Sequence, residues 1–188
     1  MRSNIANVLD LELTCYENGV FPAGEQAEII EFGLTTVDLG AGQILKTYSI
    51  PVIPTVSTVS PYCTALTGWT AAKLRRQGVP FAEACRRMAE KYGGRNRFLV
   101  TDSSDECEIV RAQCARMDVP YPLGFCKFNV SALFQLLGGL PGGLSLDEML
   151  AAVGMEFEGV RHRGSDDSRN IARLFLALKS RASFKLAE

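Results

Sequence analysis

The spacing of apolar residues changes along the chain, and the change predicts a sheet followed by helices. From Asn7 to Thr14, apolar residues surround two acids, which is typical of a buried strand. Further strands are predicted over Glu28–Asp38 and Gln43–Val52, while Cys15–Glu25 is rich in Gly, Pro and Asn and is predicted to be a loop. Because short turn-rich links join antiparallel neighbours, these three strands are expected to form a meander.

Beyond residue 60 the spacing becomes helical. Residues 60–69 are predicted to be irregular, with Pro61 and a Leu66-Thr67-Gly68 step. Apolar residues three and four apart, or a capping residue, predict helices over Thr70–Arg76, Phe81–Tyr92, Asp105–Met117, Ser131–Leu137, Ser145–Val153 and about Ser165–Lys179. Short strands are predicted over Arg97–Thr101 and Phe125–Val130. The expected fold is α/β: a mixed sheet of three antiparallel strands, then alternating helices and strands, with helices on its faces.

Composition narrows the class of protein. The 188 residues, 47% of them hydrophobic, suit a single domain over residues 1–188 with a sizeable core. With 20 basic and 21 acidic residues the net charge is −1, so there is no global basic field to attract nucleic acid. Any contact with a polyanion is therefore expected to be local.

The sequence predicts where the protein is located and whether its cysteines are reduced. No apolar run has the length of a membrane span, and the first residues lack a signal-peptide pattern. Six cysteines are present, and none forms a C-x-x-C pair. We expect reduced thiols, no disulfide framework, no zinc site, no membrane contact and a cytoplasmic location.

Candidate chemistry begins in the first strand. Asp10 and Glu12 are two residues apart, so their side chains point to the same side of a strand. Two buried carboxylates lose hydration and repel each other, and a hard cation such as Mg²⁺ with its preference for oxygen ligands would resolve this. The alternative is an edge strand that presents both acids to water.

The last predicted helix supplies further candidates. Asp167 lies four residues before Ile171 and seven before Leu174, which places it on the apolar face near the helix start. An acid there is stabilised by the helix dipole, and Asp166 is the more ordinary cap. His162, the single histidine, falls in a Gly-containing turn between arginines, where an exposed imidazole is usable near neutral pH. A purely structural His162 is the alternative.

A fourth acid is expected after the Arg97–Thr101 strand. Asp105 is four residues before Ile109 and is expected to face the core side of its helix. Asp102 competes for this role, although its position favours capping the helix or contacting the loop.

Taken in order, these motifs resemble a known family. LDLELTC (Leu9–Cys15), EIIEFG (Glu28–Gly33), YCTALTG (Tyr62–Gly68), VTDSSD (Val100–Asp105) and HRGSDDSRNIARL (His162–Leu174) are similar to DEDDh-type, DnaQ-like 3′–5′ exonucleases of the ribonuclease H-like superfamily. The subgroup of enhanced-RNAi and histone-mRNA exonucleases is the most similar. Asp10 and Glu12 match the first motif, Asp105 the second, and His162 with Asp167 the third.

The resemblance implies a chemistry for these five residues. Asp10, Glu12, Asp105 and Asp167 would hold two Mg²⁺ ions, for which Mn²⁺ substitutes, with Asp10 bridging them and Asp105 acting through water. His162 would accept a proton from the attacking water. Hydrolysis at the 3′ end would then release nucleoside 5′-monophosphates.

The resemblance also implies a substrate. The backbone near Leu13 and Thr14 would hold the terminal sugar, and Leu66 would pack on the terminal base. Single-stranded or 3′-overhanging nucleic acid is expected, with RNA favoured, although Ser104 stands where the subgroup often has an aromatic residue before the second-motif Asp. A monomer and a homodimer are both open. Two alternatives are a non-cleaving binding module of nucleic acid or protein, and an oligoribonuclease-like enzyme for very short RNA.

Overall fold

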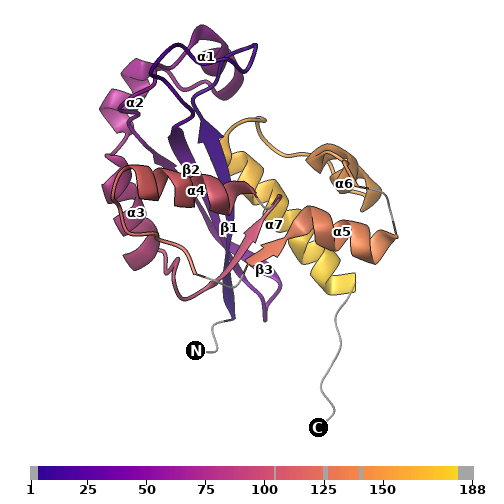
Figure 1. Cartoon of the computed structure of the whole chain (residues 1–188). Coiled ribbons are helices and arrows are strands. Elements are labelled where there is room, and N and C mark those ends of the chain that lie inside the picture. Colours follow the sequence, from indigo (N-terminus) through magenta and orange to yellow (C-terminus); the bar gives the residue numbers. More distant parts are fainter. Residues whose placement is uncertain (1–3, 104, 125–126, 140–141, 182–188) are drawn as a thin grey trace.

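A five-stranded mixed sheet forms the centre of the protein (Figure 1). The structure is a computed structural model that describes residues 4–103, 105–124, 127–139 and 142–181. The strands lie in the order β3-β2-β1-β4-β5 and are β1 (Ile5–Leu13), β2 (Ile29–Asp38), β3 (Gln43–Pro51), β4 (Phe98–Thr101) and β5 (Lys127–Asn129). The first three strands are antiparallel, and β4 and β5 run parallel to β1. The predicted mixed sheet is therefore confirmed.

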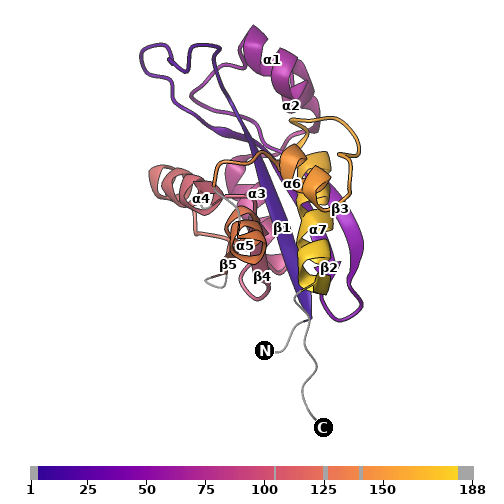
Figure 2. The same cartoon turned by 90° about the vertical axis from the view of Figure 1, so that its right-hand side faces the viewer.

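Helices cover both faces of the sheet (Figures 1 and 2). They are α1 (Pro61–Thr67), α2 (Ala71–Gln77), α3 (Phe81–Glu90), α4 (Asp105–Arg116), α5 (Val130–Gly138), α6 (Leu146–Ala152) and α7 (Gly164–Arg181). One core packs β1 and β2 against α3 and α4, and a second packs the sheet against α5, α6 and α7. None of these helices, in the described residues, is long and apolar enough to cross a membrane.

Alternation along β1 decides what each face of this strand meets. Ala6 and Val8 belong to the core under α7, whereas Leu9 belongs to the core under α3 and α4. Asp10 has the same parity as Ala6 and Val8, so it lies on the α7 face. The two acids of β1 therefore lie where the apolar packing under α7 ends.

Two glycines let the start of α7 approach β2 closely. A Cβ atom at Gly33 would lie 1.8 Å from the carbonyl oxygen of Gly164, and one at Gly164 would lie 3.0 Å from the Gly33 nitrogen. Only residues without a side chain permit this backbone contact. It sets the first turn of α7 directly over the centre of the sheet.

The predicted elements mostly match the observed ones, with one clear error. Residues 60–69 were expected to be irregular, but Ser60 caps α1 by accepting a hydrogen bond from the Cys63 nitrogen at 2.9 Å. Thr70 caps α2, and the predicted capping box before α6 is present. Ser104 and the first two residues of the predicted strand Phe125–Val130 lie outside the described residues. The five described cysteines are free thiols.

Candidate metal centre

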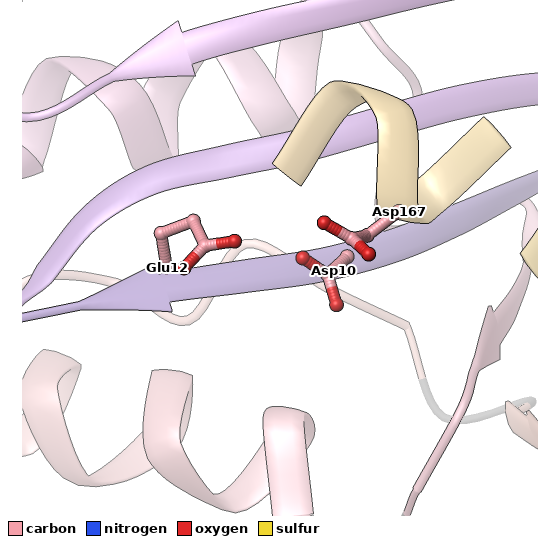
Figure 3. A group of neighbouring side chains, drawn as sticks. All are labelled: Asp10, Glu12 and Asp167. Carbon is pink, nitrogen blue, oxygen red and sulfur yellow. The ribbon is translucent and has the colours of Figure 1, made fainter. Parts of the chain in front are cut away.

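Three carboxylates from two distant parts of the chain meet on the α7 face of the sheet (Figure 3). Asp10 and Glu12 rise from β1, and Asp167 comes from the first turn of α7 with its carboxylate turned toward theirs. One oxygen from each acid lies within 4.8 Å of the others. The sequence-based prediction that these three side chains converge is confirmed.

The three acids are unfavourably placed for negative charge. Burial, followed by the charges of Asp167 and Glu12, raises the pKa of Asp10 well above its ordinary value. Burial and the charge of Asp167 likewise raise the pKa of Glu12 to about 8. Burial raises the pKa of Asp167 to about 6, although a backbone hydrogen bond from Arg163 opposes the increase. All three shifts reflect charge that the protein does not neutralise.

The donor set fits a hard divalent cation. None of the residues that the structure describes donates a hydrogen bond to Asp10 or Glu12, and these acids have no ion pair with a described lysine or arginine. Carboxylate oxygens at this separation are the ligands that Mg²⁺ and Mn²⁺ prefer. A cation would remove both the repulsion and the desolvation penalty that raise the three pKa values.

Local hydrogen bonds hold Asp167 in place. The Arg163 nitrogen donates to Asp167 Oδ2 at 2.9 Å, and the Asp167 nitrogen donates to the Arg163 carbonyl oxygen, also at 2.9 Å. Asp166 points elsewhere and accepts a hydrogen bond from the Val160 nitrogen at 2.9 Å. Asp167 therefore belongs to the group of three acids, whereas Asp166 holds the preceding loop through a hydrogen bond, as a capping residue does.

His162 lies in the turn that leads into α7. Its side chain is exposed, and its backbone is left-handed with φ of 57°. This conformation is uncommon for a residue with a side chain, and it is often a feature of functional positions. The predicted exposure of the imidazole is confirmed, and its role stays a prediction.

The second motif is arranged differently from the sequence-based expectation. Asp105 is exposed, so the expectation that it faces the core is wrong, and it lies outside the three-acid group. Asp102 accepts a hydrogen bond from Ser131 Oγ at 2.8 Å, which joins the end of β4 to α5. The next acid along the helix, Glu106, is partly buried and is one of the charges that raise the pKa of Asp10.

The residues expected to contact substrate are held rigidly. The Leu13 carbonyl oxygen accepts a bond from Cys63 Sγ at 3.5 Å, which links β1 to α1. Thr14 is buried, and its hydroxyl accepts a hydrogen bond from the Glu28 nitrogen at 3.0 Å. Leu66 is partly buried on α1. Their roles toward substrate stay predictions.

Two of the three arginines that flank the third motif, Arg161 and Arg163, act on the acids through their charge. Arg161 pairs with Asp147 and lowers the pKa of Asp167, whereas Arg169 pairs with Glu158. The charge of Arg163 lowers the pKa of Glu12, in opposition to burial and the neighbouring acids. Arg163 also lines a cavity of about 300 Å³ together with Lys73 and other residues.

Glu31 supports the site and was not singled out from the sequence. It is buried, and it accepts hydrogen bonds from Trp69 Nε1 at 2.7 Å, Ser49 Oγ at 2.5 Å and the Gly164 nitrogen at 3.2 Å. The last bond adds to the contact between Gly33 and Gly164 that fixes the start of α7. An acid inside an apolar strand was the available signal, but its partners lie far away in sequence.

Comparisons with known proteins agree with this geometry. The model of the RNase T exonuclease family matches residues 8–175. The 3′-5′ exoribonuclease 1 of Rattus norvegicus is 31% identical over 178 residues, which cover 89% of this chain and 50% of that protein. The 3′-5′ exonuclease Snipper of Drosophila melanogaster is 28% identical over 186 residues, with 88% and 66% covered. The chain thus spans about half the length of the exoribonuclease 1 proteins it matches.

Solved structures extend the likeness to three dimensions. The nuclease domain of 3′hExo, a DEDDh family member bound to rAMP, superposes with a TM-score of 0.86 at 26% identity, covering 96% of this chain and 94% of that one. A structure of a 3′-exonuclease in 3′-end specific recognition of a histone mRNA stem-loop gives a TM-score of 0.81 at 26% identity, with 97% and 84% covered. The mixed sheet is the ribonuclease H-like fold, and the chain belongs to the RNase T exonuclease family as a DEDDh, DnaQ-like member.

Proposed function

We propose that this chain is a metal-dependent 3′–5′ exonuclease that removes nucleoside 5′-monophosphates from RNA. The observation that carries the proposal is the convergence of Asp10, Glu12 and Asp167, whose carboxylate oxygens lie within 4.8 Å of one another and form no ion pair with a lysine or arginine that the structure describes. Membership of an exonuclease family supports the same reaction.

The acids of this cluster would hold two Mg²⁺ ions, for which Mn²⁺ would substitute. Asp10, Glu12 and Asp167 supply three carboxylates, and a fourth comes from the start of α4, where the motif names Asp105. When bound, such ions neutralise the acids and stabilise charge on the attacking and leaving oxygens. Arg163 adds a positive charge beside Glu12 that suits a phosphate group.

His162 would act as the general base. Its exposed imidazole stands five residues before Asp167, at the turn that opens α7, where an attacking water has access. General-base assistance typically contributes ~10²–10⁴-fold. Changing His162 to Gln should lower kcat by about that factor while Mn²⁺ affinity is retained, and an equal loss of both would make His162 structural.

RNA with a single-stranded or overhanging 3′ end is the favoured substrate. The names of the exoribonuclease relatives and the histone mRNA stem-loop of one solved relative support RNA. The backbone of Leu13 and Thr14 would contact the terminal sugar, and Leu66 the terminal base. We further propose a cytoplasmic enzyme that acts as a monomer or a homodimer.

A time course on 5′-labelled RNA and DNA of matched sequence tests this function. Each substrate, single-stranded and 3′-overhanging, is incubated with Mg²⁺, with Mn²⁺ and with EDTA. We expect a metal-dependent ladder that shortens from the 3′ end, faster on RNA, and no ladder with Asp10→Asn. The proposal would be wrong if the wild type shortened neither nucleic acid in any metal while still binding it, since this is the behaviour of a non-cleaving module.

A further inference from the structure

The start of α4 carries two adjacent acids, Asp105 and Glu106, that differ in exposure. Glu108 and Ala112 lie on the same helical face as Asp105, and all three residues are exposed. Glu106 shares its face with Val110 and Gln113, which are both buried. The helix therefore turns Glu106 toward the protein and Asp105 toward solvent.

The topology brings this inward face next to the three-acid cluster. Strands β1 and β4 are parallel with Val8 opposite Val100, so β4 ends at Thr101 beside the stretch of β1 that leads to Asp10. The chain then turns into α4, which contacts β1. After burial and the charges of Asp167 and Glu12, the charge of Glu106 also raises the pKa of Asp10. The two carboxylates thus repel each other across the end of β1.

Hydrogen bonds with Ser103 fix how the Glu106 side chain points. Ser103 Oγ donates to Glu106 Oε2 at 2.9 Å, the Ser103 nitrogen donates to Oε1 at 3.3 Å, and Ser103 Oγ accepts from the Asp105 nitrogen at 3.1 Å. A role in capping α4 is the simpler explanation for the position of the Glu106 side chain. Glu148, the glutamate of the capping box before α6, is exposed, however, whereas Glu106 is partly buried.

We propose that Glu106, rather than Asp105, supplies the fourth carboxylate of the metal centre. The inference rests on the proposed function, because it concerns the same cations. It changes the second motif of this chain from an aspartate to the glutamate that follows it. Like Asp105, Glu106 lies outside the group of oxygens that approach within 4.8 Å, but Ser103 holds its carboxylate on the side of α4 that faces the protein, whereas Asp105 is exposed.

Titration of Mn²⁺ into the metal-free full chain, with free Mn²⁺ measured by electron paramagnetic resonance, tests the assignment without reference to cleavage. Three variants are compared with the wild type: Glu106→Gln, Asp105→Asn and Glu108→Gln. Gln at position 106 can still accept from the Ser103 nitrogen through Oε1, and its Nε2 can donate to Ser103 Oγ, so the start of α4 is preserved, and thermal unfolding verifies this. Glu108→Gln is the matched control, because Glu108 is an exposed acid of the same turn that pairs with Arg111 and Lys127.

We expect the three variants to differ in their affinity for Mn²⁺. Glu106→Gln should weaken binding of at least one Mn²⁺ ion by about tenfold or more, while Asp105→Asn and Glu108→Gln should change it by less than about threefold. RNA cleavage should follow the same order. Equal losses in Glu106→Gln and Asp105→Asn, or a larger loss in Asp105→Asn, would overturn the assignment of Glu106 alone. A wild type that neither binds Mn²⁺ nor cleaves RNA would overturn the proposed function together with it.

Discussion

Two buried glutamates, one on β1 and one just before β2, have pKa values shifted in opposite directions. Glu28, just before β2, is 1% exposed, and Glu12 on β1 is 7% exposed. Burial pushes the pKa of Glu28 upward, but hydrogen bonds from the backbone nitrogens of Ser57, Val56 and Thr55 outweigh it, so the pKa is lowered. The pKa of Glu12 rises to about 8, because burial and the charges of Asp167 and Glu31 exceed the opposing effect of Arg163.

Burial alone therefore does not distinguish a structural acid from a functional one. Glu28 binds the backbone of residues 55–57 and the hydroxyl of Thr55, which is a complete set of donors for a carboxylate. Glu12, Asp10 and Asp167 face one another instead. A site that the protein leaves electrostatically incomplete is one that an external cation can complete.

The largest effect is expected from Asp10→Asn. Cleavage of RNA should fall by more than roughly 100-fold, the upper end of what loss of a supporting group around a metal costs. In chelator, the same variant should unfold at a higher temperature than the wild type, because one repelling charge has been removed. Gel-based rates and thermal unfolding measure the two outcomes. A less stable variant would contradict the repulsion within the cluster.

The pH dependence of stability without metal should be large as well. The raised pKa values of Asp167, about 6, and Glu12, about 8, mean that the folded state is favoured while these acids are protonated. Stability is then fully present below about pH 4 and is lost as pH rises from about 4 to about 8, by on the order of several kcal/mol in all. Denaturant unfolding in EDTA at pH 5 and pH 8.5 measures this loss of unfolding free energy. Glu12→Gln should make the free energy of unfolding less dependent on pH, whereas Glu28→Gln should leave the dependence on pH in this range unchanged.

The position of Asp167 should depend on the glycine contact below it. Gly33→Ala places a Cβ atom within 1.8 Å of the Gly164 carbonyl oxygen, so the start of α7 must move away from β2. We expect a loss of about 2–3 kcal/mol in unfolding free energy and a weaker affinity for Mn²⁺. Gly142→Ala is the control, because a Cβ atom there meets only the side chain of Gln135, at the ordinary contact distance of 3.4 Å. A Gly33→Ala protein with unchanged Mn²⁺ affinity would show that Asp167 does not need this contact.

Glu28→Gln should have a smaller effect than Asp10→Asn. It should lower the unfolding temperature, which Asp10→Asn should raise in chelator. The backbone donors of residues 55–57 lose their charged acceptor, which costs about 2 kcal/mol and lowers Tm by about 4–8 °C. Cleavage per folded molecule should be retained. Thermal unfolding and rates measured well below Tm distinguish these outcomes, and a stabilised Glu28→Gln would remove the contrast between the two glutamates.

Much of this site could be predicted from local patterns. The two-residue period of a strand put Asp10 and Glu12 on one side, and the spacing of Asp167 to Ile171 and Leu174 put it on the buried face of α7; both were correct. The same helical argument failed for Asp105. Its neighbour Ile109 is only partly buried, and the buried face of α4 is centred on Cys107, Val110 and Cys114.

The remaining features depend on contacts that are distant in sequence. Glu31 is satisfied by Trp69, Ser49 and Gly164, and Glu28 by residues 55–57, so no pattern around either glutamate indicates its state. Residues 60–69 were predicted to be irregular because Pro61 suggested a turn. Proline also suits the first turn of a helix, and Ser60 provides the cap that starts α1.

The most direct test of the account is the thermal unfolding of metal-free protein at pH 8 as Mg²⁺ is added. The wild type should begin at a low Tm, which should rise with Mg²⁺ concentration because the cation binds only the folded cluster. Asp10→Asn should begin higher and respond little. A wild-type Tm that is indifferent to Mg²⁺ and to Mn²⁺ would contradict the claim that Asp10, Glu12 and Asp167 form a cation site.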